Sequence, residues 1–409
     1  MIQFGMPTLI ENGTLEENVA LCHELGLKFI ELNMNFPEYQ VDQLEDTDRL
    51  IRIAEEAGIY YTIHLDENLN IADFNPLVSE AYLETVRRAI EVAVRLLPLK
   101  DKFGEASQPL TINMHMHHGI HITLPDRKVQ MYDRDFDTYM KAFAKFRDLC
   151  EEWIGEEDVK IVIENTEGFR GYEQKAIDFL LQSPKFGLTW DIGHSKAVKE
   201  IDVPFILARQ DRLVHFHIHD GKEEPPKNHL ALGDGEIDLQ ERLRTADHCH
   251  ARCVLETKTI EALRHSVAWL RPMKRELGIA RCGLACCLCS ENITCKGCRQ
   301  DGFLDLSWCQ DAAWCEVRKC VLEQGIKGCY ECAAEGCTPA SCHKGLLADK
   351  IKPRAFAEYV RRYGMEDLLD HLERNAEAGI VYHREGIMGD YDDFDNLEDL
   401  IDFIRTGKR

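Results

Sequence analysis

Residues 160–194, KIVIENTEGFRGYEQKAIDFLLQSPKFGLTWDIGH, contain one complete repeat of the fold. A β-branched apolar run at Lys160–Thr166 predicts a buried strand, and the pattern at Tyr172–Leu181 predicts an amphipathic helix. A second apolar run follows at Gly187–Asp191. A strand, a helix and a strand in this order predict two parallel strands joined by a crossover helix.

The same unit recurs on both sides of this stretch, up to residue 278. Eight alternating units predict a parallel (β/α)₈ barrel, an α/β fold, rather than a doubly wound open sheet. No glycine-rich phosphate fingerprint follows the first strand, which argues against a nucleotide-binding sheet. The predicted strands are Ile2–Met6, Phe29–Met34, Tyr60–Leu65, Leu110–Met116, Lys160–Thr166, Gly187–Asp191, Leu213–His219 and Cys253–Thr257. The predicted helices are Thr14–Leu25, Asp46–Ala57, Ser79–Leu97, Asp135–Trp153, Tyr172–Leu181, Val203–Arg209, Asp238–Cys249 and Ile260–Leu277.

The cysteines set the C-terminal part of the chain apart. Of the 17 cysteines, 13 fall between Cys282 and Cys342, and four lie in the preceding barrel. We therefore expect three parts, which are a TIM barrel at residues 1–278, a small cysteine-rich metal-binding module at 279–345 and a helical tail at 346–409. The helices predicted in the tail are Arg354–Arg374 and Leu397–Ile404.

The net charge and the hydropathy of the chain limit the classes of partner that it could bind. The net charge of −23 divides into −17 for residues 1–278 and −6 for residues 279–409, which argues against a nucleic-acid partner. The N-terminus lacks the basic and apolar regions of a secretory signal, and no stretch approaches the ~18 apolar residues of a membrane span. We expect a cytoplasmic protein with reduced thiols and no membrane partner. The sequence leaves the oligomeric state open.

Six consecutive strands end in residues that bind metal ions. Because the C-terminal ends of barrel strands meet at one mouth, these side chains predict a site for a divalent transition metal, Zn²⁺ or Mn²⁺. Alternation puts the three histidines of the seventh strand on one face, so the sequence does not decide which of them is the ligand. The residues at the strand ends are His64, His115, His117, His118, Glu164, Asp191, His194, His215, His217, His219 and Glu256.

At these residues the chain resembles the xylose isomerase-like barrel superfamily, which joins sugar isomerases and epimerases with endonuclease IV-type AP endonucleases. The matching motifs are Glu164-Asn-Thr, Asp191-Ile-Gly-His194, His217-Ile-His-Asp220, His229-Leu-Ala-Leu-Gly-Asp-Gly-Glu-Ile-Asp238 and Glu256-Thr-Lys. The epimerase branch implies one divalent metal, and its ligands match Glu164, Asp191, His217 and Glu256. The histidine of that branch that touches substrate matches His194.

This branch implies an isomerase or epimerase acting on a sugar, sugar phosphate or related polyol. A metal that binds a carbonyl and its neighbouring hydroxyl acidifies the C–H they share, because it stabilises the enediolate. Glu164 and Glu256 would then remove and return the proton, and His194 would steady the developing oxyanion. Three basic side chains are candidates to bind a carboxylate or phosphate group of the substrate, and they are Lys258, Arg170 and Lys222. The alternative for each is a solvated position on the protein surface.

Two other functions stay open at this stage. The endonuclease branch implies a three-zinc phosphodiesterase site, and its additional histidines match His64, His117 and His229. The aspartate that this branch carries two residues before the loop histidine is replaced here by Lys227, which argues against the full site. A barrel that binds or senses metal without catalysis is the third alternative, and it would turn nothing over.

The cysteine-rich segment predicts further metal sites. Its C-x₂-C pairs let two thiolates bind one tetrahedral ion, so we expect structural zinc, with iron–sulfur as the alternative. With Cys287 set aside, the candidate ligands are Cys282, Cys286, Cys289, Cys295, Cys298, Cys309, Cys315, Cys320, Cys329, Cys332, Cys337 and Cys342. At Cys282-Gly-Leu-x-Cys, Cys295-x-Gly-Cys298-Arg and Cys329-x-Glu-Cys332 the segment resembles a cysteine-rich domain of unknown function, which implies no defined activity.

Overall fold

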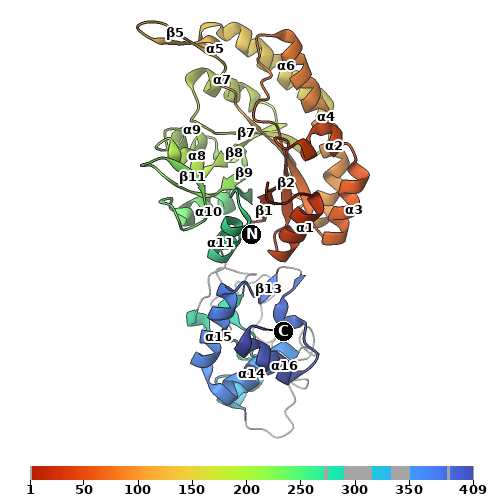
Figure 1. The fold of residues 1–409 in the computed structure, drawn as a ribbon, viewed down its shortest axis with the longest axis vertical. Helices are drawn as coiled ribbons and strands as arrows, with labels where there is room; N and C mark the ends of the chain where they lie inside the picture. The colour runs from red at the N-terminus through yellow and green to blue at the C-terminus, as the bar shows by residue number, and fades with distance from the viewer. Residues whose placement is uncertain (1, 271–274, 290–315, 333–350, 385–386, 409) are drawn as a thin grey trace. The chain divides into compact units, whose positions relative to one another are not determined.

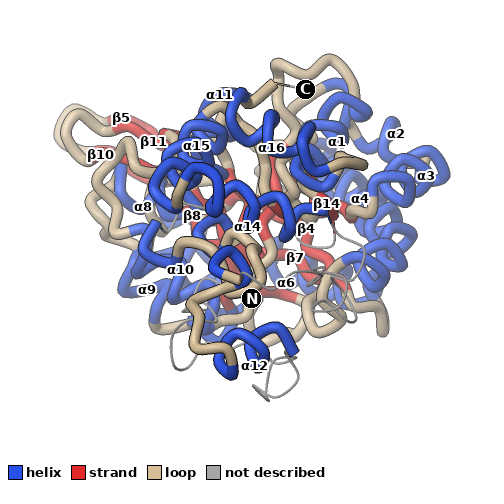
Figure 2. The backbone as a smooth tube through the Cα atoms, turned by 90° about the horizontal axis from the view of Figure 1, so that it is seen from below, coloured by secondary structure: helices blue, strands red, loops and turns tan. Residues whose placement is uncertain are grey.

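The N-terminal part of the chain is a closed barrel of eight parallel strands, which confirms the predicted (β/α)₈ fold. In this computed structural model the strands follow the order β1-β12-β9-β8-β7-β4-β3-β2, and β1 pairs with both β2 and β12. In Figure 2 the red strands of the barrel lie inside its blue helices. The strands are β1 (Phe4–Pro7), β2 (Phe29–Asn33), β3 (Tyr60–His64), β4 (Leu110–His115), β7 (Val159–Glu164), β8 (Phe186–Asp191), β9 (Leu213–Ile218) and β12 (Arg252–Leu255).

The structure describes residues 2–270, 275–289, 316–332, 351–384 and 387–408. The chain divides into two compact units, Met1–Ser266 and Val267–Arg409 (Figure 1). Among the described residues, no helix has the length and apolarity that crossing a membrane requires.

Local signals set the ends of the barrel helices. Thr14 and Glu17 form a reciprocal capping box at the start of α1, and Asp46 caps α3. Gly58 ends α3 with a φ of +69°, a conformation that favours glycine. The helices of this unit are α1 (Leu15–Glu24), α2 (Val41–Leu44), α3 (Thr47–Ala57), α4 (Pro76–Phe103), α5 (Met131–Arg134), α6 (Phe136–Ile154), α7 (Gly171–Leu180), α8 (Ile192–Ala197), α9 (Val203–Leu207), α10 (Leu239–His248) and α11 (Ile260–Leu270).

The barrel differs from the sequence prediction at one long helix, at three short helices and at two hairpins, and the unpredicted short helices are α2, α5 and α8. The helix predicted to end at Leu97 continues as α4 through Pro98 to Phe103, and its last turn is held by buried Lys100, which pairs with Asp158 at 3.2 Å. Two hairpins were not predicted, and both follow barrel strands. They are β5 (His121–Thr123) with β6 (Lys128–Gln130), and β10 (Asp220–Lys222) with β11 (Lys227–Leu230). The hairpin strands β5, β10 and β11 lie at the left edge of Figure 2.

The four barrel cysteines lie outside the predicted site, and three of them, Cys22, Cys150 and Cys253, are buried. Burial raises the pKa of each of these thiols, which keeps them protonated and unreactive at neutral pH. We expect iodoacetamide at pH 8 to modify half-buried Cys249 first and to leave the other three unmodified until the barrel unfolds. Peptide mass spectrometry with and without urea checks this. Rapid modification of Cys150 in the folded protein would contradict it.

The C-terminal unit has its own core. The predicted helix Arg354–Arg374 is wrong as a single element, because Gly364, with a φ of +95°, separates α14 (Ile351–Tyr363) from α15 (Met365–Glu377). Phe356, Leu372 and Phe403 pack in this core together with Cys287, the cysteine that the sequence set aside. The remaining elements include α12 (Glu316–Glu323), β13 (His383–Arg384), β14 (Ile387–Met388) and α16 (Leu397–Thr406).

Half of the candidate thiolate ligands lie within the residues that the structure describes. Cys282 packs in a small cluster beside Cys286 and Cys329, and the backbone N–H of Cys329 donates to Arg281 O at 2.8 Å. The described thiols do not form a group of three with ligand distances, so structural metal in this segment stays a prediction. The candidates that lie outside the described residues are Cys295, Cys298, Cys309, Cys315, Cys337 and Cys342.

Candidate active site

Four side chains from four strands meet at the mouth of the barrel. Their ligand atoms all lie within 4.8 Å of one another, and the residues are Glu164 at the end of β7, Asp191 at the end of β8, His217 on β9 and Glu256 just after β12. His217 Nδ1 lies 3.2 Å from Glu164 Oε1, 3.1 Å from Glu256 Oε2 and 3.9 Å from Asp191 Oδ2. None of the four residues is more than 5% exposed. The structure thus brings together the four predicted ligands of the epimerase-type site.

Four atoms of this cluster are buried without a hydrogen-bond partner. Three of them converge, which are Glu164 Oε1, His217 Nδ1 and Glu256 Oε2, and the fourth is His217 Nε2 on the opposite side of the ring. A buried polar atom without a partner is costly, and a convergent set of such atoms is explained by a ligand that they share. Carboxylate oxygens and one imidazole nitrogen suit a divalent ion such as Mn²⁺ or Zn²⁺. The residues present therefore fit a single divalent cation.

The neighbouring imidazoles keep the cluster ionised. Burial acts to raise the pKa of Glu164, but His217 and His115 outweigh it and hold that pKa well below its usual value. Burial also opposes ionisation of Glu256, and there His217 and Lys258 outweigh it, so the pKa of Glu256 is again well below normal. Ionised carboxylates are the form that binds a metal ion.

Two histidines lie against the second oxygen of Glu164. His115 Nε2 is 3.2 Å and His64 Nε2 is 3.4 Å from Glu164 Oε2, and Asn113 donates a hydrogen bond to the same oxygen. The sequence matched His64 and His117 to this position. The structure places His115 there instead, while His117 lines the cavity and accepts the N–H of Gly119 at its Nδ1.

A second group of histidines lies on the other side of the cluster. His194 Nδ1 is 3.1 Å from Asn165 O and His229 Nδ1 is 3.0 Å from Glu256 O, so each donates Nδ1–H to a carbonyl and keeps Nε2 for another partner. His229 has a φ of +54°, which is uncommon for a residue with a side chain and typical of functional sites.

His219 belongs to this group but is already fully hydrogen-bonded. Its Nδ1 accepts the backbone N–H of His229 at 2.7 Å, and its Nε2 lies 2.9 Å from Asp191 Oδ2. A ring that uses both nitrogens in this way has no lone pair left for a metal ion. His219 is therefore placed to orient Asp191, and His217 is the histidine of β9 whose ligand atom lies within 4.8 Å of those of Glu164, Asp191 and Glu256.

Asp220 folds the loop that carries His229. Its Oδ1 accepts the backbone N–H groups of Gly221 and Ile237, and its Oδ2 accepts those of Gly233 and Gly235. The four distances lie between 2.8 and 3.2 Å. A side chain on Gly235 would meet Asp220 Oδ1 at 2.1 Å, so this motif needs glycine there. Lys227, which replaces the aspartate of the endonuclease branch, is exposed on β11.

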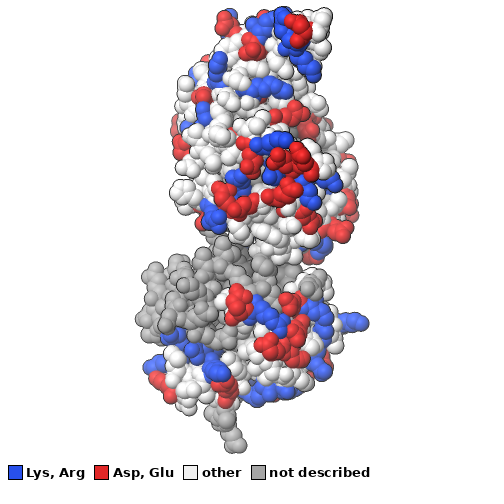
Figure 3. Space-filling view, turned by 90° about the vertical axis from the view of Figure 1, so that its left-hand side faces the viewer, with Lys and Arg blue, Asp and Glu red and all other residues white. Residues whose placement is uncertain are grey.

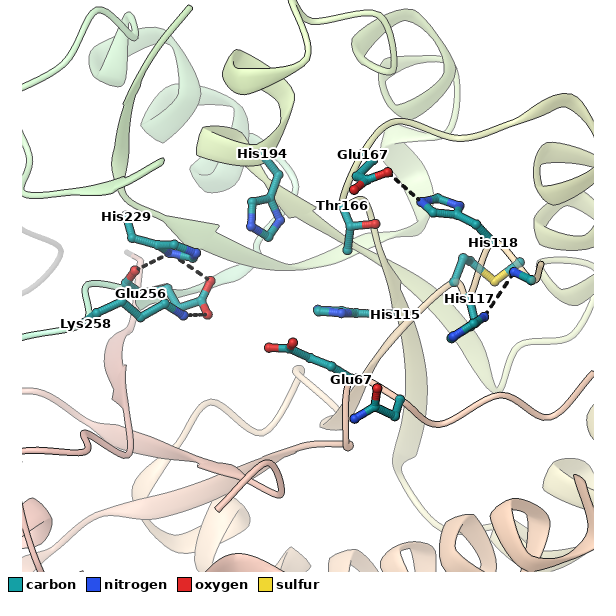
Figure 4. Close-up of a pocket in the computed structure, with 13 residues that line it drawn as sticks. Glu67, His115, His117, His118, Thr166, Glu167, His194, His229, Glu256 and Lys258 are labelled. Carbon is teal, nitrogen blue, oxygen red and sulfur yellow. Dashed lines mark hydrogen bonds and ion pairs between the residues drawn. The ribbon is translucent and has the colours of Figure 1, made fainter. Parts of the chain in front are cut away.

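The cluster opens into a cavity of about 500 Å³, a volume suited to a small molecule. Figure 4 shows His194 and His229 above Glu256, with His115 projecting from the opposite wall. Lys258 Nζ lies 2.8 Å from Glu256 Oε1 at this wall. The lining is strongly polar and comprises Glu67, Asn68, His115, Met116, His117, His118, Gly119, Thr166, Glu167, His194, His229, Glu256 and Lys258.

Two further buried pairs were missed by the sequence reasoning. Glu31 on β2 is 1% exposed and contacts His215 and His217 from below the cluster. Buried Glu173 on α7 lies 2.5 Å from Nδ1 of His118, which lines the cavity. A lone acid inside the apolar strand FIELN was the one signal for Glu31. Of the other candidate cations, Arg170 lies 3.8 Å from Glu173, and neither it nor Lys222 is among the lining residues.

Gly193 provides the space that His219 occupies. A Cβ on Gly193 would lie 1.9 Å from His219 Cε1, so the ring would have to move and leave Asp191. We expect Gly193→Ala to lower the free energy of unfolding by about 1–3 kcal/mol, as overpacking does. Urea denaturation measures the change. The matched control is Gly171→Ala, where a Cβ meets nothing within 4 Å. Equal stability of the two variants would show that this contact is unimportant.

Comparisons with known proteins agree with this architecture. The family model described as "Xylose isomerase-like TIM barrel" matches residues 19–273. A second model, described as "Protein of unknown function (DUF3795)", matches residues 290–341, most of which lie outside the described residues. No relative of curated function matches the chain.

Solved structures share the barrel fold at low sequence identity. A 3-keto-D-glucoside 4-epimerase from E. coli, in its apo form, has a TM-score of 0.52 at 14% identity, over 66% of this chain and 99% of that one. A D-tagatose 3-epimerase-like protein has a TM-score of 0.49 at 20% identity, over 64% and 94% of the two chains. A xylose isomerase domain protein from Planctomyces limnophilus has a TM-score of 0.49 at 12% identity, over 66% and 95%. The likeness to the first of these, at 14% identity, shows the fold alone.

Proposed function

The chain belongs to the xylose isomerase-like TIM barrel family, and on that premise we propose that it is a divalent-metal-dependent isomerase or epimerase acting on a sugar, sugar phosphate or related polyol. One observation carries the proposal: Glu164 Oε1, His217 Nδ1 and Glu256 Oε2 are buried without partners and converge beside a polar cavity. Asp191 completes a set of ligands for Mn²⁺ or Zn²⁺.

Two carboxylates supply the proton transfer in this proposal. A bound divalent ion would polarise a carbonyl and the neighbouring hydroxyl of the substrate and so acidify the C–H that they share. Glu256 Oε1, kept ionised by Lys258 at 2.8 Å, can accept a proton at the cavity wall. Glu164 ends a different strand, β7, and does not line the cavity, so in this proposal it would meet the substrate at the metal position, where one carboxylate would remove the proton and the other return it.

His194 is suited to stabilise negative charge on the substrate. Burial acts to lower the pKa of His194, but in the metal-free chain Asp191 and Glu164 outweigh it and raise the pKa to about 10. A cation bound to these two carboxylates would reduce that rise in the pKa. Its Nδ1–H is fixed on Asn165 O, so the ring presents its other nitrogen to the cavity. A protonated imidazole held in this way donates a hydrogen bond to a developing oxyanion.

Isotope exchange tests the proposed reaction. The protein is loaded with Mn²⁺ and incubated in D₂O with a panel of ketoses, aldoses and their phosphates. We expect one substrate class to gain deuterium at a carbon next to the carbonyl, detected by proton NMR and mass spectrometry. No exchange with any member of the panel, by a protein that binds Mn²⁺ at the barrel, would favour the non-catalytic sensing alternative.

The second candidate function is a metal-dependent phosphodiesterase. The observation in its favour is the pair His64 and His115 on Glu164 Oε2, which resembles the ligands of a second metal ion. Against it, His219 is fully hydrogen-bonded and Lys227 is exposed, so a third ion would have only His194 and His229. Acidic and basic side chains are interspersed over the barrel surface drawn in Figure 3, which does not form a basic track for a phosphate backbone.

Metal counting separates the two candidates. Elemental analysis of Zn, Mn and Fe per chain is compared between the intact protein and the Asp191→Asn variant, which retains all the cysteines. One ion lost in the variant supports the epimerase-type site. A loss of two or three ions, together with cleavage of abasic-site DNA, would support the phosphodiesterase.

A further inference from the structure

A buried carboxylate, that of Glu31, contacts the group of four candidate metal ligands through His217. Glu31 projects from β2 into the barrel, and its Oε1 is 2.8 Å from His217 Nε2. Its other oxygen, Oε2, is 2.9 Å from His215 Nε2 and accepts a hydrogen bond from Thr62 Oγ1 at 3.2 Å. Glu31, His215 and His217 are each no more than 1% exposed.

Glu31 Oε1 lies 2.8 Å from His217 Nε2 and is the acceptor that a proton on this nitrogen would meet, although the contact does not have hydrogen-bond geometry in this structure. An imidazole that donates Nε2–H to a carboxylate carries its lone pair on Nδ1. His217 Nδ1 is the atom that faces Glu164 Oε1 and Glu256 Oε2, at 3.2 and 3.1 Å. The opposite tautomer would present an N–H to the metal position and could not bind an ion there.

The second oxygen of Glu31 is fixed independently. His215 lies two residues before His217 on the same strand, and its Nδ1 is 3.4 Å from Thr111 Oγ1. Glu31 is therefore held by His215 and Thr62 at one oxygen while the other meets His217. Because His215 uses Nε2 on Glu31 and its Nδ1 faces Thr111, this ring has no nitrogen free for an ion. That favours a support for His217 over another metal site, although the ligand atoms of Glu31, His215 and His217 also lie within 4.8 Å of one another.

Resting on the metal site of the proposed function, we propose that Glu31 is a positioning residue for His217, which sets the tautomer and the ring orientation of the metal ligand and so determines metal affinity. A carboxylate behind a ligating histidine also makes the imidazole a stronger donor. Removal of such a partner weakens metal binding by roughly 10- to 100-fold in other proteins. Glu31 touches neither the cavity nor the proposed substrate, since it is absent from the lining residues.

The test measures metal affinity directly. Mn²⁺ is the probe because thiolates prefer softer ions, so the cysteine-rich segment contributes little. Free Mn²⁺ is counted by electron paramagnetic resonance during titration of the full-length protein after chelation. We expect Glu31→Leu to weaken Mn²⁺ binding by roughly 10- to 100-fold, as loss of a carboxylate behind a ligating histidine does. Glu31→Gln should lie in between, at least about threefold weaker than the intact protein, because an amide oxygen can still accept Nε2–H but carries no charge.

A matched variant controls for the loss of a buried acid. Glu173 is also fully buried and lies 2.5 Å from a histidine, His118, that is not a metal ligand in this proposal. Glu173→Gln should lower stability in a similar way and leave the Mn²⁺ dissociation constant within about twofold of that of the intact protein. Circular dichroism shows which variants fold, and if Glu31→Leu does not fold, Glu31→Gln decides the question.

The outcomes separate this inference from the proposed function. If the intact protein binds Mn²⁺ and Glu31→Gln binds it equally well, the role of Glu31 is overturned while the proposed function stands. Equal weakening in Glu173→Gln would also overturn it, because the effect would then be structural. If the intact protein binds no Mn²⁺ and elemental analysis finds no ion lost in Asp191→Asn, the metal site itself is wrong and the proposed function fails with it.

Discussion

Glu256→Gln is expected to lower kcat/KM by roughly a thousandfold for whichever substrate exchanges deuterium, since general acid–base groups contribute about 10²–10⁴-fold. The change removes an anionic ligand and a proton acceptor together, while it keeps the size of the side chain. The loss should appear mainly in kcat, because the group acts in the transition state rather than in ground-state binding. Steady-state kinetics at saturating Mn²⁺ measure it.

Two further variants distinguish loss of proton transfer from loss of metal binding as the cause of the lower kcat/KM. Glu256→Asp keeps the charge but shortens the side chain, so it should retain metal while losing turnover if proton transfer is the role of this carboxylate. Glu55→Gln on α3 changes a glutamate whose side chain is 48% exposed and should leave the kinetics unchanged. Loss of the metal in Glu256→Gln together with retained turnover would refute the role proposed for this carboxylate.

Metal binding should also stabilise the barrel. The ligands converge only in the folded chain, so an ion that binds there stabilises it by RT ln(1 + [M]/Kd), about 4 kcal/mol at a thousand times Kd. We expect urea denaturation with excess Mn²⁺ to give that increase over the chelated protein. Far-ultraviolet circular dichroism follows the transition of the parallel barrel.

Asp191→Asn is the control for this stabilisation. Asp191 is fully buried and accepts hydrogen bonds from His194 N and His219, so its amide preserves the shape of the side chain while it removes a charged ligand. The variant should show almost no dependence of its stability on Mn²⁺. An equal gain in the variant and in the intact protein would place the stabilising ion elsewhere in the chain.

The strands could be predicted from sequence because their apolar runs are short, β-branched and bounded by polar loops. The predicted strand at Leu213–His219 differs from β9 by one residue at its end. Longer-range effects were not visible in the sequence. Helix α4 continues past Pro98 to Phe103, and buried Lys100 in its last turns pairs with Asp158, a residue far along the chain. The break at Gly364 depends on a backbone conformation that a helical pattern does not reveal.

The sequence predicted those site residues that belong to a recognisable motif. It could not choose among histidines on the same face of one strand, because the choice depends on how far along the strand each ring lies. Period-two alternation places His115 and His117 on one face, but β4 ends at His115, so only that ring reaches Glu164. The same ambiguity among His215, His217 and His219 is resolved by their different partners. Sequence gave little indication of Glu31, since its role depends on a neighbour 186 residues away on a strand across the barrel, His217.

The four hydrogen bonds to Asp220 affect the entropy cost of binding a molecule in the cavity. They join Asp220 at the start of β10 to Gly221, Gly233, Gly235 and Ile237 through protein groups alone, and the segment between β10 and Ile237 carries His229. The conformational entropy of this segment is therefore lost once, when the barrel folds, and not again each time a substrate arrives. One wall of the cavity is thus held by protein contacts alone, and we expect a molecule that binds there to meet the imidazole of His229 already in position.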